Sequence, residues 1–238
     1  MPIEHNPDYI HHIKNGSTAT FREMIFGMED GMVSTLGAVT GIAAASGSYF
    51  AVILAGLVII SVESISMAVG SYLSSKSARG IEERMLTEEK TELKKFPEEE
   101  RRELIDMYIV DGWPPDLANT MANEAAKNKK LFLQEMAYRE LGIIPAKMAN
   151  PFKNGVVMLF SYMFGGSIPL VAYFFLPLNI AIIASVVFTL AGLFLLGVYA
   201  AKFSKRKWWK AGFEMFFLAT IAASIGFVVG QLVNRFFR

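Results

Sequence analysis

The chain has 238 residues, of which 53% are hydrophobic and only 19% charged, with 23 basic and 22 acidic side chains. A soluble domain usually has about 25% charged residues, so this composition disfavours an ordinary cytosolic enzyme. The absence of cysteine excludes disulfides, thiolate metal sites and thiol nucleophiles, and a net charge of +1 gives no reason to expect a nucleic-acid partner.

The charges are concentrated in one segment. Residues 76–153 hold 15 of the 22 acids and 14 of the 23 bases, whereas the rest of the chain is strongly apolar. This distribution predicts an all-α polytopic membrane protein that carries a small charged insert. We therefore expect four parts: an N-terminal segment (1–21), a first pair of spans (22–75), the insert (76–153) and a second group of spans (154–238).

Five transmembrane helices are predicted from the apolar stretches. The first twenty residues are polar and lack the apolar core of a signal peptide, so the spans themselves are expected to target the protein. A spanning helix needs about 20 apolar residues. The stretches that meet this length predict two spans within 31–75, separated by a turn near 47–49, two within 154–201, separated by a bend at Pro177, and one within 211–234.

The insert between the second and third spans is predicted to be helical. Apolar residues recur at helical spacing after residue 80, and Pro97 followed by three glutamates is typical of a helix start. Gly142 is expected to end the last of these helices, because glycine is the usual residue just after a helix C-terminus. The expected helices cover residues 80–95, 97–110, 115–128 and 130–141.

The basic residues predict the orientation, because loops rich in Lys and Arg remain in the cytoplasm. The connection 202–210 has five of them beside two tryptophans, whereas the turns near 47–50 and 175–179 have no charge. The N-terminus and the insert are therefore expected in the cytoplasm. The tail 235–238, which has two arginines, would then lie on the opposite side, and this counts against the assignment.

Ionisable residues in the first two spans are candidates for an ion pathway. A carboxylate in lipid costs at least about 2.5 kcal/mol, so Glu29, Asp30 and Glu63 are expected to face a pathway or a partner. Glu63 and Met67 share a helix face, and a carboxylate beside a thioether suits a divalent transition metal. Alternatively, Glu29 and Asp30 are solvated helix ends and Met67 is a packing residue.

Acids in the insert form a second candidate site. Three pairs at a spacing of three or four residues each lie on one helix face, and together they offer six oxygen or sulfur ligands: Glu89 and Glu92, Glu100 and Glu103, Met136 and Glu140. Glu-rich helices are usually only solvated, and the spacing alone does not separate the two interpretations.

No catalytic set is recognisable, and we expect neither enzyme activity nor a permanently bound cofactor. The only histidines, at positions 5, 11 and 12, lie in the polar N-terminal segment, and no nucleotide-binding motif occurs. The chain therefore lacks the pair of nucleophile and general base that an intramembrane hydrolase needs. Glycines at GxxxG spacing (27 and 31, 226 and 230) predict close helix approach, either within the chain or in a dimer.

Three segments together resemble the vacuolar iron transporter family. They are Arg22–Val39 (REMIFGMEDGMVSTLGAV), Leu54–Ser77 (LAGLVIISVESISMAVGSYLSSKS) and Gly165–Leu170 (GGSIPL). The resemblance implies a homodimeric exporter with five spans and a cytoplasmic insert, which moves Fe²⁺ out of the cytosol in exchange for protons. It also implies a vacuolar-type membrane in a eukaryote or the cell membrane in a prokaryote.

Matching the family pattern residue by residue implies two groups of functional positions. Asp30 and Met67 fall on pathway residues, and the insert ligands fall on Glu89, Glu92, Glu100, Glu103, Met136 and Glu140. The chain departs from the pattern at Ile59, where some members have an acid, at Glu63, where a small residue is usual, and at Ala137, where some have a second methionine. We interpret Glu63 as the acid of the family pattern, displaced by one helical turn from position 59. Because Ala137 replaces a methionine, we expect that Mn²⁺ or other divalent ions can bind beside Fe²⁺.

The leading hypothesis is therefore a proton-coupled Fe²⁺ or Mn²⁺ exporter in the lipid bilayer, with Asp30, Glu63 and Met67 in its pathway. The alternative is a membrane-anchored sensor or buffer of divalent metal, in which the insert binds cations and the spans only anchor it.

Overall fold

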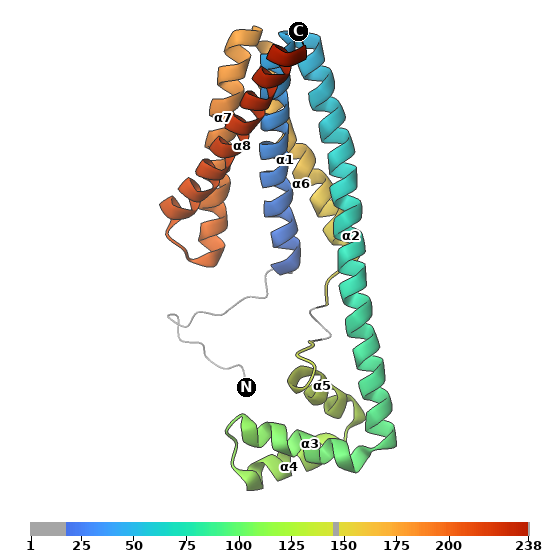
Figure 1. Ribbon diagram of the computed structural model, residues 1–238. Helices are drawn as coiled ribbons and strands as arrows, with labels where there is room; N and C mark the ends of the chain where they lie inside the picture. Colours follow the sequence, from blue (N-terminus) through green and yellow to red (C-terminus); the bar gives the residue numbers. More distant parts are fainter. Residues whose placement is uncertain (1–17, 145–147, 238) are drawn as a thin grey trace, which may run out of the picture.

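The computed structural model describes residues 18–144 and 148–237, so the three histidines lie outside the described residues. Within those ranges the chain forms eight helices joined by turns and short connections, and no strand (Figure 1). The helices are α1 (Thr18–Ser46), α2 (Tyr49–Lys95), α3 (Pro97–Val110), α4 (Pro115–Ala126), α5 (Lys129–Arg139), α6 (Pro151–Phe175), α7 (Leu178–Ser204) and α8 (Trp208–Phe237). The all-α prediction is therefore confirmed.

Four of these helices, α2, α6, α7 and α8, are long and apolar enough to cross a membrane. The remaining candidate span, α1, is 29 residues long and packs between α6 and α8 in the same bundle (Figure 1). Its charged residues at 22, 23, 29 and 30 make it less apolar than its neighbours. Four of the predicted spans thus have matching helices, and the crossing by α1 stays a prediction.

The predicted turns between spans are present. Gly47 has a φ of +59°, a left-handed conformation that glycine adopts without strain, and the Ser48 side chain accepts a hydrogen bond from the Ala51 N–H at the start of α2. Pro177 directly precedes α7 and separates it from α6. Both pairs of helices are therefore joined by short turns, as the sequence predicts.

The helix that contains the second predicted span does not end at residue 75. The sequence predicts a separate helix over 80–95, but the structure continues α2 without a break from Tyr49 to Lys95, a length of about 70 Å at 1.5 Å per residue. No proline interrupts this stretch, and ion pairs one turn apart support its polar half, between Arg79 and Glu83 and between Arg84 and Glu88. One helix therefore runs from the bundle into the insert (Figure 1).

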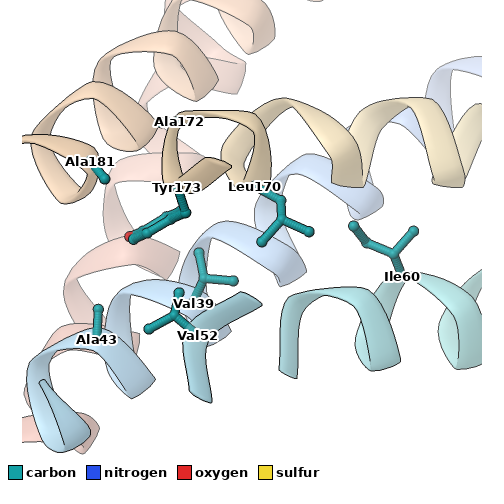
Figure 2. Close-up of a cluster of buried hydrophobic side chains, with 8 residues drawn as sticks. All are labelled: Val39, Ala43, Val52, Ile60, Leu170, Ala172, Tyr173 and Ala181. Carbon is teal, nitrogen blue, oxygen red and sulfur yellow. The ribbon is translucent and has the colours of Figure 1, made fainter. Parts of the chain in front are cut away.

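The bundle and the insert have separate hydrophobic clusters. In the bundle, Val39 of α1, Val52 of α2 and Tyr173 of α6 belong to a cluster that also includes Ala181 of α7 (Figure 2). In the insert, α3, α4 and α5 pack through a separate cluster: Leu104, Ile105, Tyr108, Ala118, Ala122, Ala125, Phe132 and Met136. The insert thus has a core of its own, beside the polar half of α2.

Glycines allow α1 to contact two helices through backbone. Gly31 lies so close to α6 that an added Cβ would overlap the Tyr162 carbonyl and come within 2.8 Å of the Gly166 nitrogen. On α8, Cβ atoms on Gly226 and Gly230 would each lie 2.9 Å from a Cα atom of α1. Both GxxxG pairs are therefore used for packing within the chain, which decides between the two uses that the spacing left open.

This packing predicts that Gly31→Ala destabilises the protein, because the methyl group would meet backbone that cannot move aside. We expect a cost of about 1 to 3 kcal/mol, typical of overpacking, measured as a lower midpoint of thermal unfolding in detergent. Gly80→Ala is the matched control. No atom among the described residues lies within 4 Å of its added Cβ, so its stability should not fall. Equal midpoints for the two variants would contradict the close contact.

Candidate metal site and a polar cluster in the bundle

Three glutamates from three helices meet beside the insert core. Glu89 lies near the end of α2, Glu100 in the first turn of α3, and Glu140 at the C-terminal cap of α5. One carboxylate oxygen from each lies within 4.8 Å of the others. Pro97 begins α3 directly after Phe96, the C-cap of α2, and the reversal there brings Glu100 back to Glu89.

Two of these carboxylates are removed from water. Glu89 is 2% exposed and Glu100 is 7% exposed, while Glu140 remains exposed. Within the described part of the chain, Glu89 Oε1 and Glu100 Oε2 are buried and have no hydrogen-bond partner. Buried polar atoms are rarely left unpaired, because each costs about 1 to 3 kcal/mol, and a bound cation would satisfy both. The site therefore has the geometry and the vacant ligand atoms of a cation site.

Burial also changes the acidity of the cluster. Loss of hydration raises the pKa of Glu89 to about 8, with further contributions from a hydrogen bond to Glu140 and from nearby carboxylates. The pKa of Glu100 rises to about 7, again through burial first and then through the charge of Glu103. The same two causes, burial and neighbouring acids, raise the pKa of Glu103. Near neutral pH the cluster therefore holds protons that a divalent cation would displace.

The other three predicted ligands lie around this triad in different ways. Glu92 and Glu103 are close enough for their charges to act on the buried carboxylates, but neither belongs to the group within 4.8 Å. Met136 lies one turn before Glu140 and is fully buried in the hydrophobic cluster of the insert. The structure thus brings three of the six together and places two beside them and one in the core.

A second polar group lies within the bundle. The carboxylates of Asp30 on α1 and Glu63 on α2 are near enough to interact electrostatically, as are those of Glu29 and Glu214. The Ser34 hydroxyl donates to the Asp30 carbonyl at 2.6 Å and lies 2.6 Å from the hydroxyl of Tyr162, which is fully buried. Sequence analysis missed Ser34 and Tyr162. The position of Ser34, one turn after Asp30, is the signal that would have indicated it.

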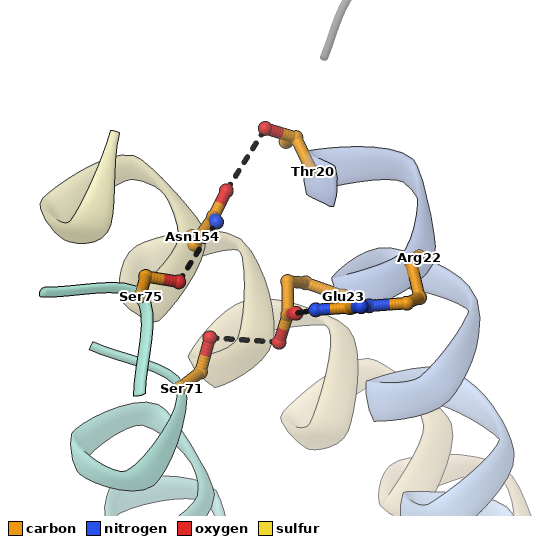
Figure 3. Close-up of polar contacts among 6 residues, drawn as sticks. All are labelled: Thr20, Arg22, Glu23, Ser71, Ser75 and Asn154. Atoms are coloured by element: carbon orange, nitrogen blue, oxygen red, sulfur yellow. Dashed lines mark hydrogen bonds and ion pairs between the residues drawn. The ribbon is translucent and has the colours of Figure 1, made fainter. Parts of the chain in front are cut away.

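The groove beside Met67 also contains an acid that sequence analysis missed. Glu23 is 7% exposed and accepts hydrogen bonds from Ser71 at 2.7 Å and Arg22 at 3.0 Å (Figure 3). It lines one groove with Met67, Ser66 and Met158. Two more hydrogen bonds join α6 to α1 and α2 there. The Asn154 side chain of α6 accepts one from Thr20 of α1 and donates one to Ser75 of α2. Polar side chains thus hold α1, α2 and α6 together at the insert end of the bundle.

The sequence of the chain is similar to that of known proteins. The model of the VIT family matches residues 21–231. The chain belongs to the VIT family. Vacuolar iron transporter 1 of Arabidopsis thaliana is 30% identical over 94% of this chain and 91% of its own length. The vacuolar iron transporters of Toxoplasma gondii and Plasmodium berghei are 30% and 31% identical over 92% and 90% of this chain, and over 76% and 82% of their own lengths.

Membership in the VIT family, together with four apolar helices of spanning length, identifies the chain as an integral membrane protein. It also confirms that the protein is not an enzyme, because members of this family are transporters. The family match covers α1 to α8 almost completely, so the triad in the insert and the polar cluster in the bundle both lie inside the matched region.

The raised pKa values predict that the metal-free insert becomes less stable as pH rises. Glu89 and Glu100 ionise near pH 8 and 7 in the folded state but near 4.5 when unfolded. The folded state therefore binds more protons across this window, and its stability decreases from about pH 5 to about pH 8. We expect amide hydrogen exchange in α3 and α5, corrected for intrinsic rates, to quicken over this range.

In the Glu89→Gln variant this pH dependence should become weaker, because one of the ionising groups is removed. Glu99→Gln is the matched control, since Glu99 is exposed on the same helix turn as Glu100. If both variants keep the pH dependence of the native chain, the buried carboxylates are not its source.

Proposed function

We propose that this protein is a secondary transporter that exports Fe²⁺, with Mn²⁺ as an alternative cargo, from the cytoplasm in exchange for protons. The single observation that carries the proposal is the triad Glu89, Glu100 and Glu140, which has two buried oxygens available to a cation. The relatives named as vacuolar iron transporters support iron as the cargo. The sensor or buffer alternative is not favoured, because these relatives are named for transport.

In this proposal the insert collects the cation. The triad supplies oxygen ligands, Glu92 and Glu103 add negative charge around it, and Met136 contributes a thioether that favours transition metals over Mg²⁺. Binding releases the protons that burial retains on Glu89 and Glu100. Cation capture at the insert would therefore weaken as pH falls.

Passage through the membrane would use Asp30, Glu63 and Met67. The carboxylates of α1 and α2 lie near each other, and either can exchange a proton for a cation, which couples the two flows. Ser34 and Tyr162 extend this polar group, because their hydroxyls are in contact beside Asp30. The groove with Met67 and Glu23 opens at the end of the bundle nearest the insert, on the expected route of the cation.

The layout that we propose has five spans, with the N-terminus and the insert in the cytoplasm and the chain paired as a homodimer. The exposure of Glu63 supports the dimer. Glu63 is exposed on α2, and the adjacent apolar residue Val62 is 59% exposed. A carboxylate facing lipid is costly, so a second copy of the chain would cover this face and complete the pathway.

Transport in proteoliposomes tests the pathway. We expect Asp30→Ala and Met67→Ala each to lower the rates of Fe²⁺ uptake and proton counterflow by about tenfold or more, since losing a metal-binding group commonly has effects of this size. Met163→Ala is the control for Met67, because Met163 lies on the outer face of α6. Unchanged uptake and counterflow in both pathway variants would show that the route is wrong.

Metal binding tests the insert independently of transport. Anomalous scattering from Mn²⁺ or Fe²⁺ should appear between Glu89, Glu100 and Glu140. Glu89→Gln with Glu100→Gln should lower the affinity about tenfold or more. Glu98→Gln with Glu99→Gln removes the same charge from exposed positions and should have little effect. Scattering at another place only would reduce the triad to a buried acidic cluster.

The role of Met136 is tested by Met136→Leu, which conserves volume in the core. We expect the variant to fold normally but to lose preference for Fe²⁺ over Mg²⁺ in competition binding. An unchanged preference would leave Met136 as a packing residue only.

A further inference from the structure

The turn between α7 and α8 combines an apolar face with a concentration of positive charge. One side of α7 presents four residues at helical spacing: Leu195, Val198, Tyr199 and Lys202. Toward the turn, the side chains on this face are therefore first aliphatic, then aromatic, then cationic. The opposite side of α7 packs against α8, where an added Cβ on Gly197 would lie 2.9 Å from Gly212 Cα. The face of Leu195, Tyr199 and Lys202 is therefore not covered by α8, and the Tyr199 ring lies beside Phe21 of α1, 6.2 Å between the ring centroids.

This face lines a groove together with the turn itself. The groove is formed by Leu195, Val198 and Tyr199 along its apolar wall, by Lys202, Lys205 and Arg206 at its rim, and by Trp208 at its end. Leu195 is 64% exposed and Trp208 is 59% exposed, so neither is covered by this chain. An indole ring at the end of such a groove is typical of the boundary between acyl chains and headgroups.

The charge at the rim is not compensated within the described residues. Among the described residues, Arg206 makes an ion pair with Glu214 at 2.8 Å. The four lysines of the turn make none among those residues: Lys202, Lys205, Lys207 and Lys210. Lys205 adopts a left-handed conformation with φ of +51° at the end of α7, so the chain turns directly after it. Four uncompensated lysines thus lie where the bundle ends, at the end nearer the insert (Figure 1).

We propose that the groove of Leu195, Tyr199, Lys202 and Lys205 binds an anionic phospholipid. The phosphate and acidic headgroup would contact Lys202 and Lys205, and an acyl chain would lie along Tyr199, Val198 and Leu195. Basic groups next to membrane-spanning helices attract anionic lipids, and here an apolar groove continues directly from the charges. A lipid fits both halves of the groove, whereas a free phosphate would contact only its rim.

Native mass spectrometry of the full chain in detergent provides the test, with phosphatidylglycerol and phosphatidylcholine of the same acyl chains as probes. We expect retention of phosphatidylglycerol over phosphatidylcholine. Lys202→Gln with Lys205→Gln should weaken phosphatidylglycerol binding about tenfold, because two cations near the headgroup are lost. Lys127→Gln with Lys129→Gln, which removes the same charge from the insert, should bind like the native chain. Equal loss in both double variants, or none in either, would overturn the proposal.

A second variant tests the apolar half. Leu195→Asn should weaken phosphatidylglycerol binding, while Leu232→Asn, the same substitution at an exposed position of α8, should not. Inorganic phosphate is the competing probe. If phosphate displaces the lipid completely at equal concentration, or if Leu195→Asn binds as tightly as the native chain, the groove is an anion site without an acyl contribution and the assignment to a lipid is wrong.

Discussion

Backbone contact between α1 and its neighbours is the constraint on which the bundle depends. α1 is less apolar than α6, α7 and α8, yet it lies between α6 and α8, where glycines allow the main chains to touch. In a membrane, where lipid and apolar side chains are equally hydrophobic, such close packing is a principal source of helix association. The contact with α6 brings Tyr162 to Ser34, whose hydroxyl donates to the Asp30 carbonyl one turn earlier, so the same glycines that assemble the bundle also assemble its polar cluster.

The unbroken α2 connects the two sites. Glu63 and Met67 lie on its apolar half and Glu89 on its polar half, so one rigid element positions a residue of the insert triad and two residues of the proposed pathway. A helix transmits displacement along its axis better than a flexible linker would. The polar contacts of Glu23 with Ser71 and of Asn154 with Ser75 fix this helix against α1 and α6 at the level where it leaves the bundle (Figure 3).

The insert triad shows how burial gives ordinary glutamates a specific chemistry. The insert has many acids, and most are exposed or paired with a basic residue one turn away. Glu89 and Glu100 differ because the packing of α2, α3 and α5 removes them from water and leaves one oxygen of each without a hydrogen-bond partner among the described residues. Such carboxylates bind either a proton or a cation, and this competition is the physical basis of the proton exchange that we propose.

The sequence by itself determined the helical class, the turns at Gly47 and Pro177, the helix start at Pro97 and the residues that could serve as ligands. These follow from local rules, namely apolar length, glycine and proline conformations, and helical spacing. Spacing could not show that α2 continues through residue 75, because the charges that begin at residue 76 indicate where the chain leaves the membrane but not where the helix ends. Nor could it separate the triad from Glu92 and Glu103, or place Met136 in a core. Only the tertiary structure decided these, since desolvation of a carboxylate depends on helices that are distant in the sequence.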